Sequence, residues 1–509
     1  MLAMKIKEHI LSEEEFIFIP QFLNKKFFMR YLNLIPMLFV LNSLFFFTSC
    51  NKDDDPGIAA ENEVNAFLWG AMNSWYYWQE DVDDLKDEQF ATSSERNTFL
   101  NQFDDPNLLF ESLRYADDRF SWITDDYNAQ DEYFAGITTT FGFKYGLVRW
   151  LGDSVVGYVR YVLPDSPASE VDLIRGELFY GINGSLMTMD NYQELLQNQA
   201  SYTLDVAKIE DNVLIPTRTT TSFFARQLTE NPVFLEKVLE IEGHKIGYLM
   251  YNGFRHTFHE QLNDAFGLFK NENVTELVLD LRYNGGGSIY TTMHLASMIY
   301  GKATRADVFG KILYNEKHGG NTRALFFVDD LDVVDAEYES VSTRTLNELN
   351  IERIYILVSN RSASASELLI AGLLPYMEVR IIGDQTVGKN EGSRTLYDSP
   401  QSDFTEKDGN LNPNHTYAVQ PIISKLANSL DFSDYSTGFL PDIEAKETDY
   451  LEFMRPLGAD DELLLSIAID EITGRNGLGR IAPFSPHPII NEPLKNPFMF
   501  EMYLNGISN

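Results

Sequence analysis

The spacing of apolar residues divides the chain into a helical part and a longer part rich in strands. Between Glu61 and about residue 126, apolar residues recur every three or four positions, as on the buried face of an amphipathic helix: Val64, Phe67, Leu68, Met72, Trp75 and Trp78. Asp104-Asp105-Pro106 begins a further short helix that runs to Leu113. We therefore expect residues 58–130 to form a small helical domain.

From about residue 138 to residue 210 the pattern changes to short strands and turns. Residues 155–162 are rich in β-branched and aromatic side chains, and Asn183-Gly184 is a tight-turn signal. Residues 191–199 indicate a helix and residues 202–209 a closing strand. This segment is predicted to be a small β domain.

From residue 222 to about residue 475, strand-length apolar runs alternate with helical stretches. The expected strands are 245–251, 276–281, 353–358 and 379–382, and the expected helices are 259–270, 291–299 and 366–377. Such alternation is typical of an α/β layered core whose strand ends carry the functional loops. Residues 403–414 indicate a polar surface loop, and 476–509 a strap that ends in an aromatic patch.

Residues 1–50 are interpreted as an export signal. Lys25, Lys26 and Arg30 accompany a long apolar stretch that ends in Thr48-Ser49-Cys50. The ending resembles a bacterial lipobox, in which the cysteine is acylated, although Phe47 stands where leucine is usual. A plain secretory signal or an uncleaved membrane anchor would share these features. Because Cys50 is the only cysteine in the 509 residues, we expect it to be lipidated.

The surroundings of this signal refine the expectation. Met29-Arg30 would begin a well-proportioned signal, so we expect translation to start at Met29. Residues 51–57 form a short acidic tether that resembles the surface-export signals of some Gram-negative lipoproteins. The predicted location is the cell envelope, lipid-anchored to the outer membrane and either periplasmic or surface-exposed.

Composition excludes several classes of function. The formal net charge of −36 argues against nucleic acid or an anionic membrane surface as a partner. A single cysteine leaves no internal disulfide and no cysteine-bound zinc. His256 and His259 have H-x-x-H spacing but lack the glutamate of the zinc-peptidase motif, so no metal and no cofactor is expected.

The run Ser362-Ala363-Ser364-Ala365-Ser366 contains the candidate nucleophile. It follows an apolar strand and precedes an apolar helix, so a serine at this junction lies beside free backbone amides. The same run could be an ordinary helix start with a serine cap. Lys389 follows 25 positions after Ser364. The apolar run Ile381-Ile382 precedes it, and Gly388 stands directly before it. A lysine deprotonates a serine only when it is neutral, which requires burial of its amine.

A glycine turn supplies the third element. Asp280-Leu281-Arg282 is followed by Asn284 and three glycines, and such a turn points backbone N–H groups toward a developing oxyanion. A turn without any binding role would have the same sequence. A phosphate-binding loop is disfavoured because no Lys-Ser or Lys-Thr follows the glycines.

Together these motifs resemble peptidase family S41, the C-terminal processing peptidases, whose pattern is "DLR.N.GG", "SASASE..AG.L" and "G..T.GK" over residues 138–475. The resemblance implies an α/β core of the crotonase or ClpP type. It also implies Ser364 as nucleophile, Lys389 as general base, and the amides of Ala365 and Gly286 as oxyanion hole. Many members have glutamine four residues after the lysine, where this chain has Ser393. A hydroxyl could accept a hydrogen bond from the amine over a shorter reach.

The preceding β domain is similar to the PDZ domains of processing proteases, in the run from Ser166-Pro167-Ala168 to Ile182-Asn183-Gly184. PDZ domains bind an extended C-terminal peptide as an added strand. The loop Phe141-Gly142-Phe143 is the matching peptide-binding position, although a β domain that only packs is an open alternative. The predicted domains are thus 58–130, 138–210 and 222–475. The predicted function is an exported, lipid-anchored serine endopeptidase that cleaves polypeptides near their C-terminal end. The alternative is a peptide-binding lipoprotein on the same fold with weak or lost hydrolysis.

Overall fold

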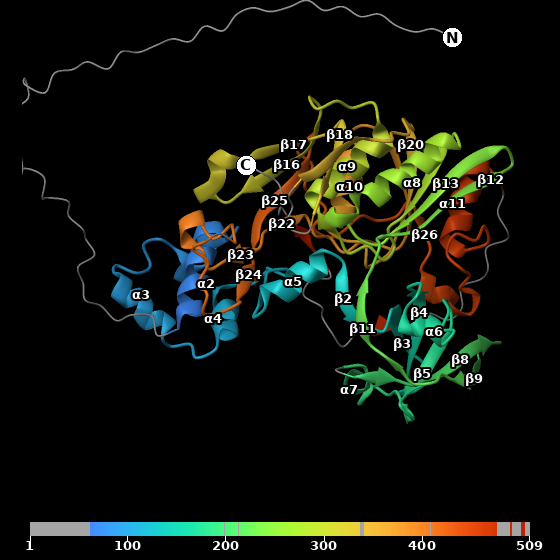
Figure 1. Ribbon diagram of the computed structural model, residues 1–509, viewed down its shortest axis with the longest axis horizontal. Helices are drawn as coiled ribbons and strands as arrows, with labels where there is room; N and C mark the ends of the chain where they lie inside the picture. The colour runs from blue at the N-terminus through green and yellow to red at the C-terminus, as the bar shows by residue number, and fades with distance from the viewer. Residues whose placement is uncertain are drawn as a thin grey trace, which may run out of the picture. The chain divides into compact units, whose positions relative to one another are not determined.

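The protein is described here by a computed structural model (Figure 1). It describes residues 62–197, 199–211, 213–335, 340–407, 409–475, 489–490 and 500–503. The predicted signal with Met29 and Cys50, the tether 51–57 and most of the strap lie outside the described residues. Within those ranges, no helix is both long and apolar enough to cross a bilayer.

A six-stranded, mostly parallel sheet forms the centre of the α/β core. Its order is β12-β13-β14-β20-β21-β26, and only β12 and β13 pair in antiparallel fashion. The strands are β12 (Val233–Ile241), β13 (His244–Tyr251), β14 (Glu276–Asp280), β20 (Arg353–Val358), β21 (Glu378–Gly383) and β26 (Ile443–Glu444). The four apolar runs expected as strands are therefore neighbours in one sheet.

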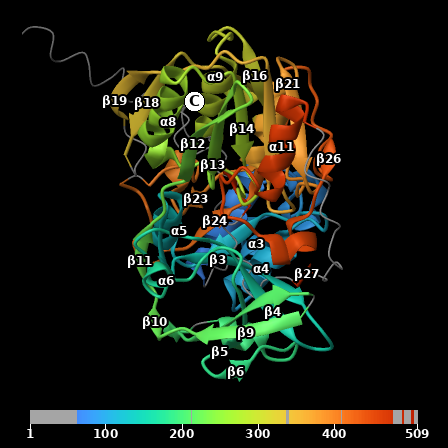
Figure 2. The same ribbon diagram turned by 90° about the vertical axis from the view of Figure 1, so that its right-hand side faces the viewer.

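Helices cover both faces of this sheet, and strand alternation decides which residues meet which helix. In β13, Tyr248 and Met250 belong to the cluster with α11 (Leu463–Thr473). Leu249 and Tyr251 belong to the larger cluster with α8 (His259–Asn271), α9 (Ile289–Tyr300) and α10 (Ala365–Leu373). Figure 2 shows α8 and α11 on opposite sides of β13 and β14. Both faces are buried, which explains the continuous apolar runs of these strands.

A second six-stranded sheet was not expected from the sequence. Its order is β15-β28-β22-β25-β16-β17. The strands are β15 (Gly287–Ser288), β28 (Met502–Tyr503), β22 (Glu391–Ser393), β25 (Ile422–Asn428), β16 (Val308–Tyr314) and β17 (Arg323–Phe326). Two of its strands directly follow the predicted glycine turn and the predicted base.

Smaller strand groups complete the core. They are the sheet β1 (Trp122–Thr124), β24 (Ala418–Gln420) and β23 (Leu396–Tyr397), and the hairpin β18 (Asp330–Val334) and β19 (Ser340–Thr345). The 3-10 helices are η1 (Gln79–Asp81), η2 (Asp83–Leu85), η3 (His256–Phe258), η4 (Glu316–Asn321), η5 (Pro400–Ser402) and η6 (Glu447–Phe453).

The predicted β domain has its own sheet and its own apolar core, which includes Leu147, Val155 and Phe179. The sheet order is β27-β3-β4-β5-β8-β9, with β6 on β5. Its strands are β3 (Phe143–Arg149), β4 (Val155–Val162), β5 (Leu178–Ile182), β6 (Ser185–Leu186), β8 (Leu204–Glu210), β9 (Val213–Thr219) and β27 (Ile489–Ile490). The short helices α6 (Pro167–Glu170) and α7 (Tyr192–Leu196) accompany it. Two small pairs flank it: β2 (Ile137–Thr140) with β11 (Arg226–Thr229), and β7 (Ser201–Tyr202) with β10 (Phe223–Phe224).

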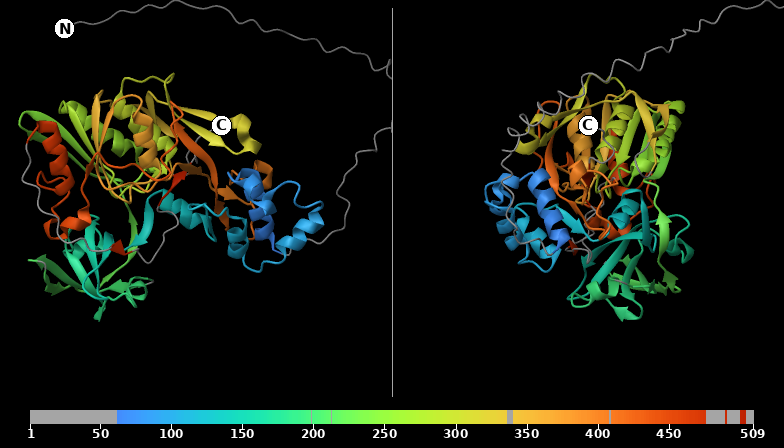
Figure 3. Two further views of the ribbon diagram at one scale, coloured as in Figure 1. Left: turned by 180° about the vertical axis from the view of Figure 1, so that it is seen from behind. Right: turned by 60° about the vertical axis from the view of Figure 1, so that its left-hand side comes forward.

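The N-terminal helices pack on the α/β core. They are α2 (Glu63–Trp75), α3 (Ser93–Leu100), α4 (Pro106–Leu113) and α5 (Tyr127–Phe134), and each begins at a capping side chain. The buried apolar residues of α2, α3 and α4 share one hydrophobic cluster with the main sheet, whereas Phe134 of α5 packs with Trp122 and Tyr503. Both views of Figure 3 show these blue helices beside the orange strands. The expected surface loop 403–414 begins in this contact, because Trp75 Nε1 donates to the carbonyl of Asp403 at 2.8 Å.

Candidate active site

Ser364 stands between the end of β20 and the first residue of α10, in a backbone conformation that side chains rarely adopt. Its φ is 65° and its ψ is −116°. Such a conformation costs on the order of 1–3 kcal/mol and persists only where surrounding contacts impose it. The residue is fully buried, and its Oγ has no hydrogen-bond partner among the described residues. The backbone is thus held in a strained shape around an unpaired hydroxyl.

The strain at Ser364 is maintained by hydrogen bonds to its neighbours. The carbonyl of Asn284, in the glycine turn, accepts from Ala363 N at 3.2 Å and from Ser366 Oγ at 3.0 Å. The carboxylate of Glu367 accepts from Ser364 N at 2.8 Å. These bonds fix the serine run against the glycine turn on one side and the helix start on the other.

Glu367 also holds the loop that carries Lys389. Its carboxylate accepts from Gly388 N at 2.7 Å, from Lys389 N at 2.8 Å and from the hydroxyl of Thr386. Burial raises the pKa of Glu367, and these donors oppose that rise. One buried carboxylate therefore joins the backbone of Ser364 to the backbone of Lys389.

The Lys389 side chain is fully buried, as the sequence requires of a base, but its partner is not Ser364. Its Nζ donates to the carbonyl of Phe500 at 2.6 Å and lies 3.4 Å from Glu501 Oε2. The Phe120 ring lies 5.0 Å from the same nitrogen. The predicted pair is brought into one site by Glu367, while the amine is bound to residues 500–501.

Ser393 does not contact the amine directly, contrary to the expectation for this position. Its hydroxyl donates to Glu501 Oε2 at 2.8 Å and receives a hydrogen bond from Gln420 Nε2 at 3.0 Å. A serine is shorter than a glutamine, so the gap to Lys389 is filled by the Glu501 carboxylate. The other oxygen of that carboxylate accepts from Trp122 Nε1 at 2.6 Å.

The glycine turn lies directly beside Ser364. Gly286 has a φ of +114°, and a Cβ added there would lie 2.9 Å from Ser364 Oγ and 2.3 Å from the carbonyl oxygen of Glu501. Only glycine fits such a position. The Gly286 amide donates to Asn284 Oδ1 at 2.9 Å, whereas the Gly287 amide donates to the Glu501 carbonyl. Ala365 is the first residue of α10, where backbone N–H groups have no partner within the helix. The oxyanion roles of Ala365 and Gly286 stay predictions.

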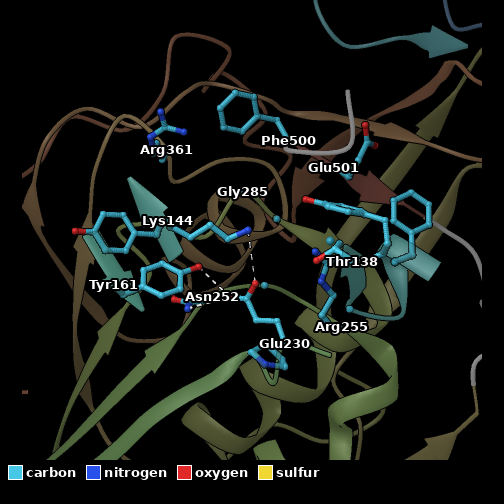
Figure 4. A pocket seen from close by; sticks show the side chains of 18 of the residues that line it. Thr138, Lys144, Tyr161, Glu230, Asn252, Arg255, Gly285, Arg361, Phe500 and Glu501 are labelled. Carbon is cyan, nitrogen blue, oxygen red and sulfur yellow. Dashed lines mark hydrogen bonds and ion pairs between the residues drawn. The ribbon is translucent and has the colours of Figure 1, made fainter. Parts of the chain in front are cut away.

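A cavity of about 290 Å³ opens beside the glycine turn (Figure 4). Lys144 and Tyr161, from the β domain, point toward Glu230, with a Tyr161 hydroxyl to Glu230 Oε1 distance of 2.9 Å. Phe500 and Glu501 lie across the cavity from Glu230. The cationic lining residues are Lys144, Arg160, Arg255 and Arg361. The cavity therefore joins the β domain to the neighbourhood of Ser364.

The predicted peptide-binding loop Phe141-Gly142-Phe143 is tied into the β domain. The Phe141 ring stacks on Tyr202 with centroids 3.9 Å apart, and Gly142 has a φ of +83°. The Gly142 carbonyl accepts from Leu163 N at 2.8 Å. Phe143 lines the cavity and begins strand β3. Peptide binding by this loop stays a prediction.

The two histidines of the H-x-x-H pair, His256 and His259, are both buried. Both ring nitrogens of His259 are engaged, Nδ1 with the Asp332 carbonyl at 2.9 Å and Nε2 with Thr291 Oγ1 at 2.8 Å. Burial lowers the pKa of His259 to about 4, so the ring is neutral at pH 7. His256 is buried in η3. Across the described ranges, no group of three or more His, Cys, Asp or Glu residues is arranged to hold a metal ion.

Asp280-Leu281-Arg282 serves a buried ion-pair cluster rather than the reacting atoms. Arg282 Nε donates to both oxygens of Asp280 at 3.0 Å, and its Nη1 and Nη2 donate to Glu462 at 2.5 and 2.8 Å. Arg282 Nη1 also donates to Glu447 at 3.2 Å, and Glu447 accepts from Arg175 of the β domain. This motif anchors the glycine turn that follows it.

Three residues at the site went unassigned in the sequence: Glu367, Gln420 and Glu501. Glu367 stands in the serine motif itself and could have been suspected, because an acidic residue in a buried run needs partners. Gln420 and Glu501 lie 27 and 108 positions from Ser393, and no local pattern marks them. Long-range pairing of β28 brings Glu501 into the site.

Sequence comparisons agree with this geometry. The model described as Peptidase family S41 matches residues 245–404, and the Peptidase S41 N-terminal domain matches residues 63–122. A CtpA-like serine protease of Staphylococcus aureus is 27% identical over 164 residues, which cover 32% of this chain and 29% of that relative. The carboxyl-terminal-processing peptidase 2 of Arabidopsis thaliana is 26% identical over 239 residues, covering 45% of this chain and 41% of that protein. The matches thus span less than half the length of these relatives.

A solved structure extends the likeness beyond the matched segments. A Bacteroides fragilis protein assigned to the S41 proteases superposes with a TM-score of 0.64 at 26% identity. The superposition covers 82% of this chain and 99% of that one. The family models match the helical N-terminal region and the sheet that carries both Ser364 and Lys389. These matches assign the helical N-terminal region and the main sheet of this chain to peptidase family S41.

Proposed function

We propose that this protein is a serine endopeptidase that works through an acyl-enzyme, with Ser364 as nucleophile and Lys389 as general base. The observation that carries the proposal is the unpaired hydroxyl of Ser364, held in a strained conformation at a helix start and joined through Glu367 to the Lys389 loop. A hydroxyl buried at such a position without a partner is costly for structure alone. Strained, unpaired groups are typical of reacting atoms.

The mechanism follows from the chemistry of the two side chains. With Lys389 neutral and turned to Ser364, its amine takes the hydroxyl proton while Oγ attacks the substrate carbonyl carbon. The negative charge on the carbonyl oxygen is stabilised by the amides of Ala365 and Gly286. The lysine then passes its proton to the leaving amine, which leaves an ester on Ser364. Water, deprotonated by the same amine, hydrolyses that ester and restores the serine.

The proposed substrate is a polypeptide cleaved near its C-terminal end. The relatives named as carboxyl-terminal-processing peptidases support this proposal. The cavity beside the glycine turn adds cationic side chains, Lys144, Arg255 and Arg361, which favour a ligand that carries a carboxylate. The β domain, with the loop at Gly142, would capture the flexible tail before cleavage.

The test is hydrolysis of β-casein by the full chain in detergent, compared with Ser364→Ala. We expect the wild-type protein to produce fragments whose new ends map near the C-terminus, and the variant to produce none. Gly142→Asp, which keeps the dyad, should lower cleavage of tail-bearing substrates more than cleavage of short peptides. Equal cleavage by wild type and Ser364→Ala would refute the proposal.

A second candidate function is peptide binding with weak hydrolysis. The observation in its favour is that Lys389 is bound to Phe500 and Glu501 rather than to Ser364. The two functions separate in one measurement, because the binding protein would retain a C-terminal peptide in equilibrium dialysis while leaving it intact over hours. Turnover of the same peptide would exclude this candidate.

We further propose that Cys50 carries a lipid that anchors the protein to the outer membrane of the cell envelope. The support is the apolar run that ends in Thr48-Ser49-Cys50 and the absence of any other cysteine from the sequence. Metabolic labelling with a palmitate analogue should mark the wild-type protein and not Cys50→Ser. Labelling of both would contradict the anchor.

A further inference from the structure

The segment Phe500–Tyr503 runs between the two loops that carry the catalytic machinery. Its strand β28 pairs in parallel with β15, with Gly287 opposite Met502 and Ser288 opposite Tyr503. On its other side, Tyr503 is opposite Ser393 of β22. Because β15 follows the glycine turn and β22 follows Lys389, this short strand fills the space between them.

The backbone of the segment is held as a bound peptide would be. The amide of Gly287 donates to the Glu501 carbonyl, and Lys389 Nζ donates to the Phe500 carbonyl at 2.6 Å. The Glu501 carbonyl oxygen and Ser364 Oγ lie on the same side of Gly286, both within 3 Å of the point where a Cβ would stand. Peptides that bind by strand addition use such main-chain contacts.

The side chains of Glu501, Met502 and Tyr503 are also buried against the rest of the protein. Met502 and Tyr503 are fully buried, and the Tyr503 ring stacks on Phe134 with centroids 4.4 Å apart. The Glu501 carboxylate is 3% exposed and takes donors from Trp122 and Ser393. Glu501 Oε2 also lies 3.4 Å from Lys389 Nζ, so the segment contacts the proposed base through a side chain as well as through its backbone.

The same part of the chain covers the peptide-recognition edge of the β domain. Strand β27 pairs in antiparallel fashion with β3, Ile489 opposite Val148 and Ile490 opposite Leu147. Without β27, strand β3 would be the edge of its sheet. It begins at Phe143, directly after the predicted peptide-binding loop. Strands β27 and β28, with eleven residues between them in sequence, thus add to the two surfaces at which the proposed substrate would bind.

We propose that strand β27 and the segment Phe500–Tyr503 are a tethered inhibitor of the enzyme, which occupies the β3 edge and the catalytic groove until a polypeptide substrate displaces it. The proposal rests on the proposed peptidase function. With the segment in place, Ser364 and Lys389 have no exposed surface, so no substrate reaches them. The base donates its hydrogen bond to the segment instead of pairing with the nucleophile. A tethered strand competes at a high effective concentration, so it suppresses weak ligands most.

The test displaces the segment in the full chain. Met502→Asp places a charge where a fully buried side chain lies, which should eject β28, and a chain that ends at Asn496 removes β28 altogether. We expect either change to raise kcat/KM for β-casein at least fivefold. Leu430→Asp, at an exposed position, is the matched control and should leave the activity unchanged. A melting curve for each variant identifies any that fails to fold.

A binding measurement keeps the outcome independent of catalysis. The probe is a fluorescein-labelled peptide with the sequence of residues 498–509. It should bind the double variant Ser364→Ala/Met502→Asp, whose groove is open. Its affinity for the single variant Ser364→Ala, whose own segment fills the groove, should be at least tenfold lower. If no form cleaves casein but this difference holds, the peptidase proposal fails and the occupied groove stands. The inhibitor proposal is overturned if both folded tail variants show unchanged or lower activity, or if both proteins bind the peptide equally. It is also overturned if purified wild type, but not Ser364→Ala, lacks residues 502–509, because the segment would then be a substrate.

Discussion

Two clusters of buried charge in the molecule differ in how their groups are paired. The catalytic cluster contains Ser364, Glu367 and Lys389, which the proposed mechanism uses, together with Glu501 of the proposed inhibitor segment. The arginine cluster contains Arg175, Asp280, Arg282, Glu447 and Glu462. In the arginine cluster each guanidinium donates to at least two carboxylates of the cluster. In the catalytic cluster the central hydroxyl has no partner, and the lysine is bound to a segment more than a hundred residues away in sequence.

The difference shows that burial of charge does not by itself identify a reactive site. Desolvation raises the pKa of buried Asp280, as it raises that of buried Glu367. What separates the two clusters is the strained φ of Ser364 and its unpaired hydroxyl. Arg282 has every donor directed to a carboxylate and stabilises the fold. Changes in the first cluster should therefore affect turnover, and changes in the second should affect stability.

Lys389→Met tests the first half of this comparison with the largest expected effect. Removing the proposed base should lower kcat on the order of 10⁴-fold, about 5 kcal/mol of transition-state stabilisation. Steady-state hydrolysis of a peptide and a urea unfolding curve are the two measurements. Lys389→Arg is the control for charge, and it should be as inactive because a guanidinium does not lose its proton. If Lys389→Met lost stability in proportion to its loss of activity, the two clusters could no longer be distinguished by their effects on turnover and on stability.

Arg282→Met breaks the second cluster. The buried carboxylates of Asp280 and Glu462 would lose their partner, so we expect the free energy of unfolding to fall by about 3–5 kcal/mol. Urea denaturation followed by circular dichroism measures this. Arg305→Met, which breaks an exposed ion pair with Asp329, should change it by less than about 1 kcal/mol. If the free energy of unfolding fell by a similar amount in both variants, burial of the ion pairs would not increase their effect on stability.

Glu447 makes the arginine cluster sensitive to acid. Burial by itself would raise its pKa, but Arg175, Arg282 and the Tyr283 hydroxyl outweigh burial and lower the pKa to about 2. Its contribution is therefore present above pH 4.5 and is lost as the pH falls from 4.5 toward 2. The loss should be on the order of 2–3 kcal/mol in unfolding free energy. In Glu447→Gln the slope of stability against pH across this range should shrink, and an unchanged slope would assign it to other carboxylates.

Gln420→Met is the smallest test and concerns the support of the catalytic cluster. Gln420 Nε2 donates to Ser393 Oγ, while its Oε1 accepts from Gln130 and Thr395. Without this donor the Ser393 hydroxyl loses one of its hydrogen bonds. We expect kcat to fall about threefold to tenfold, which corresponds to a rise of roughly 1 kcal/mol in the activation free energy. Because the role is positional, KM should stay constant. A change in KM alone would place Gln420 in substrate binding.

Local patterns predicted the elements of the core well, and long-range pairing was beyond them. The strand 353–358 and the helix after it follow from apolar runs and a serine motif, so Ser364 could be located from the sequence. The parallel strands were expected, but the second sheet was missed because β15, β22 and β28 have only two or three residues each. Such strands have no periodicity of their own. The link from Ser393 to Glu501 depends on that sheet, which is why the sequence left a gap at Ser393.

The left-handed backbone at position 364 has a consequence for how this fold could change with time. Glycine would occupy that φ without strain, whereas every other residue type is less stable there. A chain released from the need to hydrolyse peptides would gain stability by drifting to glycine. The serine in this sequence thus stands against the preference of its own backbone, as its proposed role as nucleophile requires.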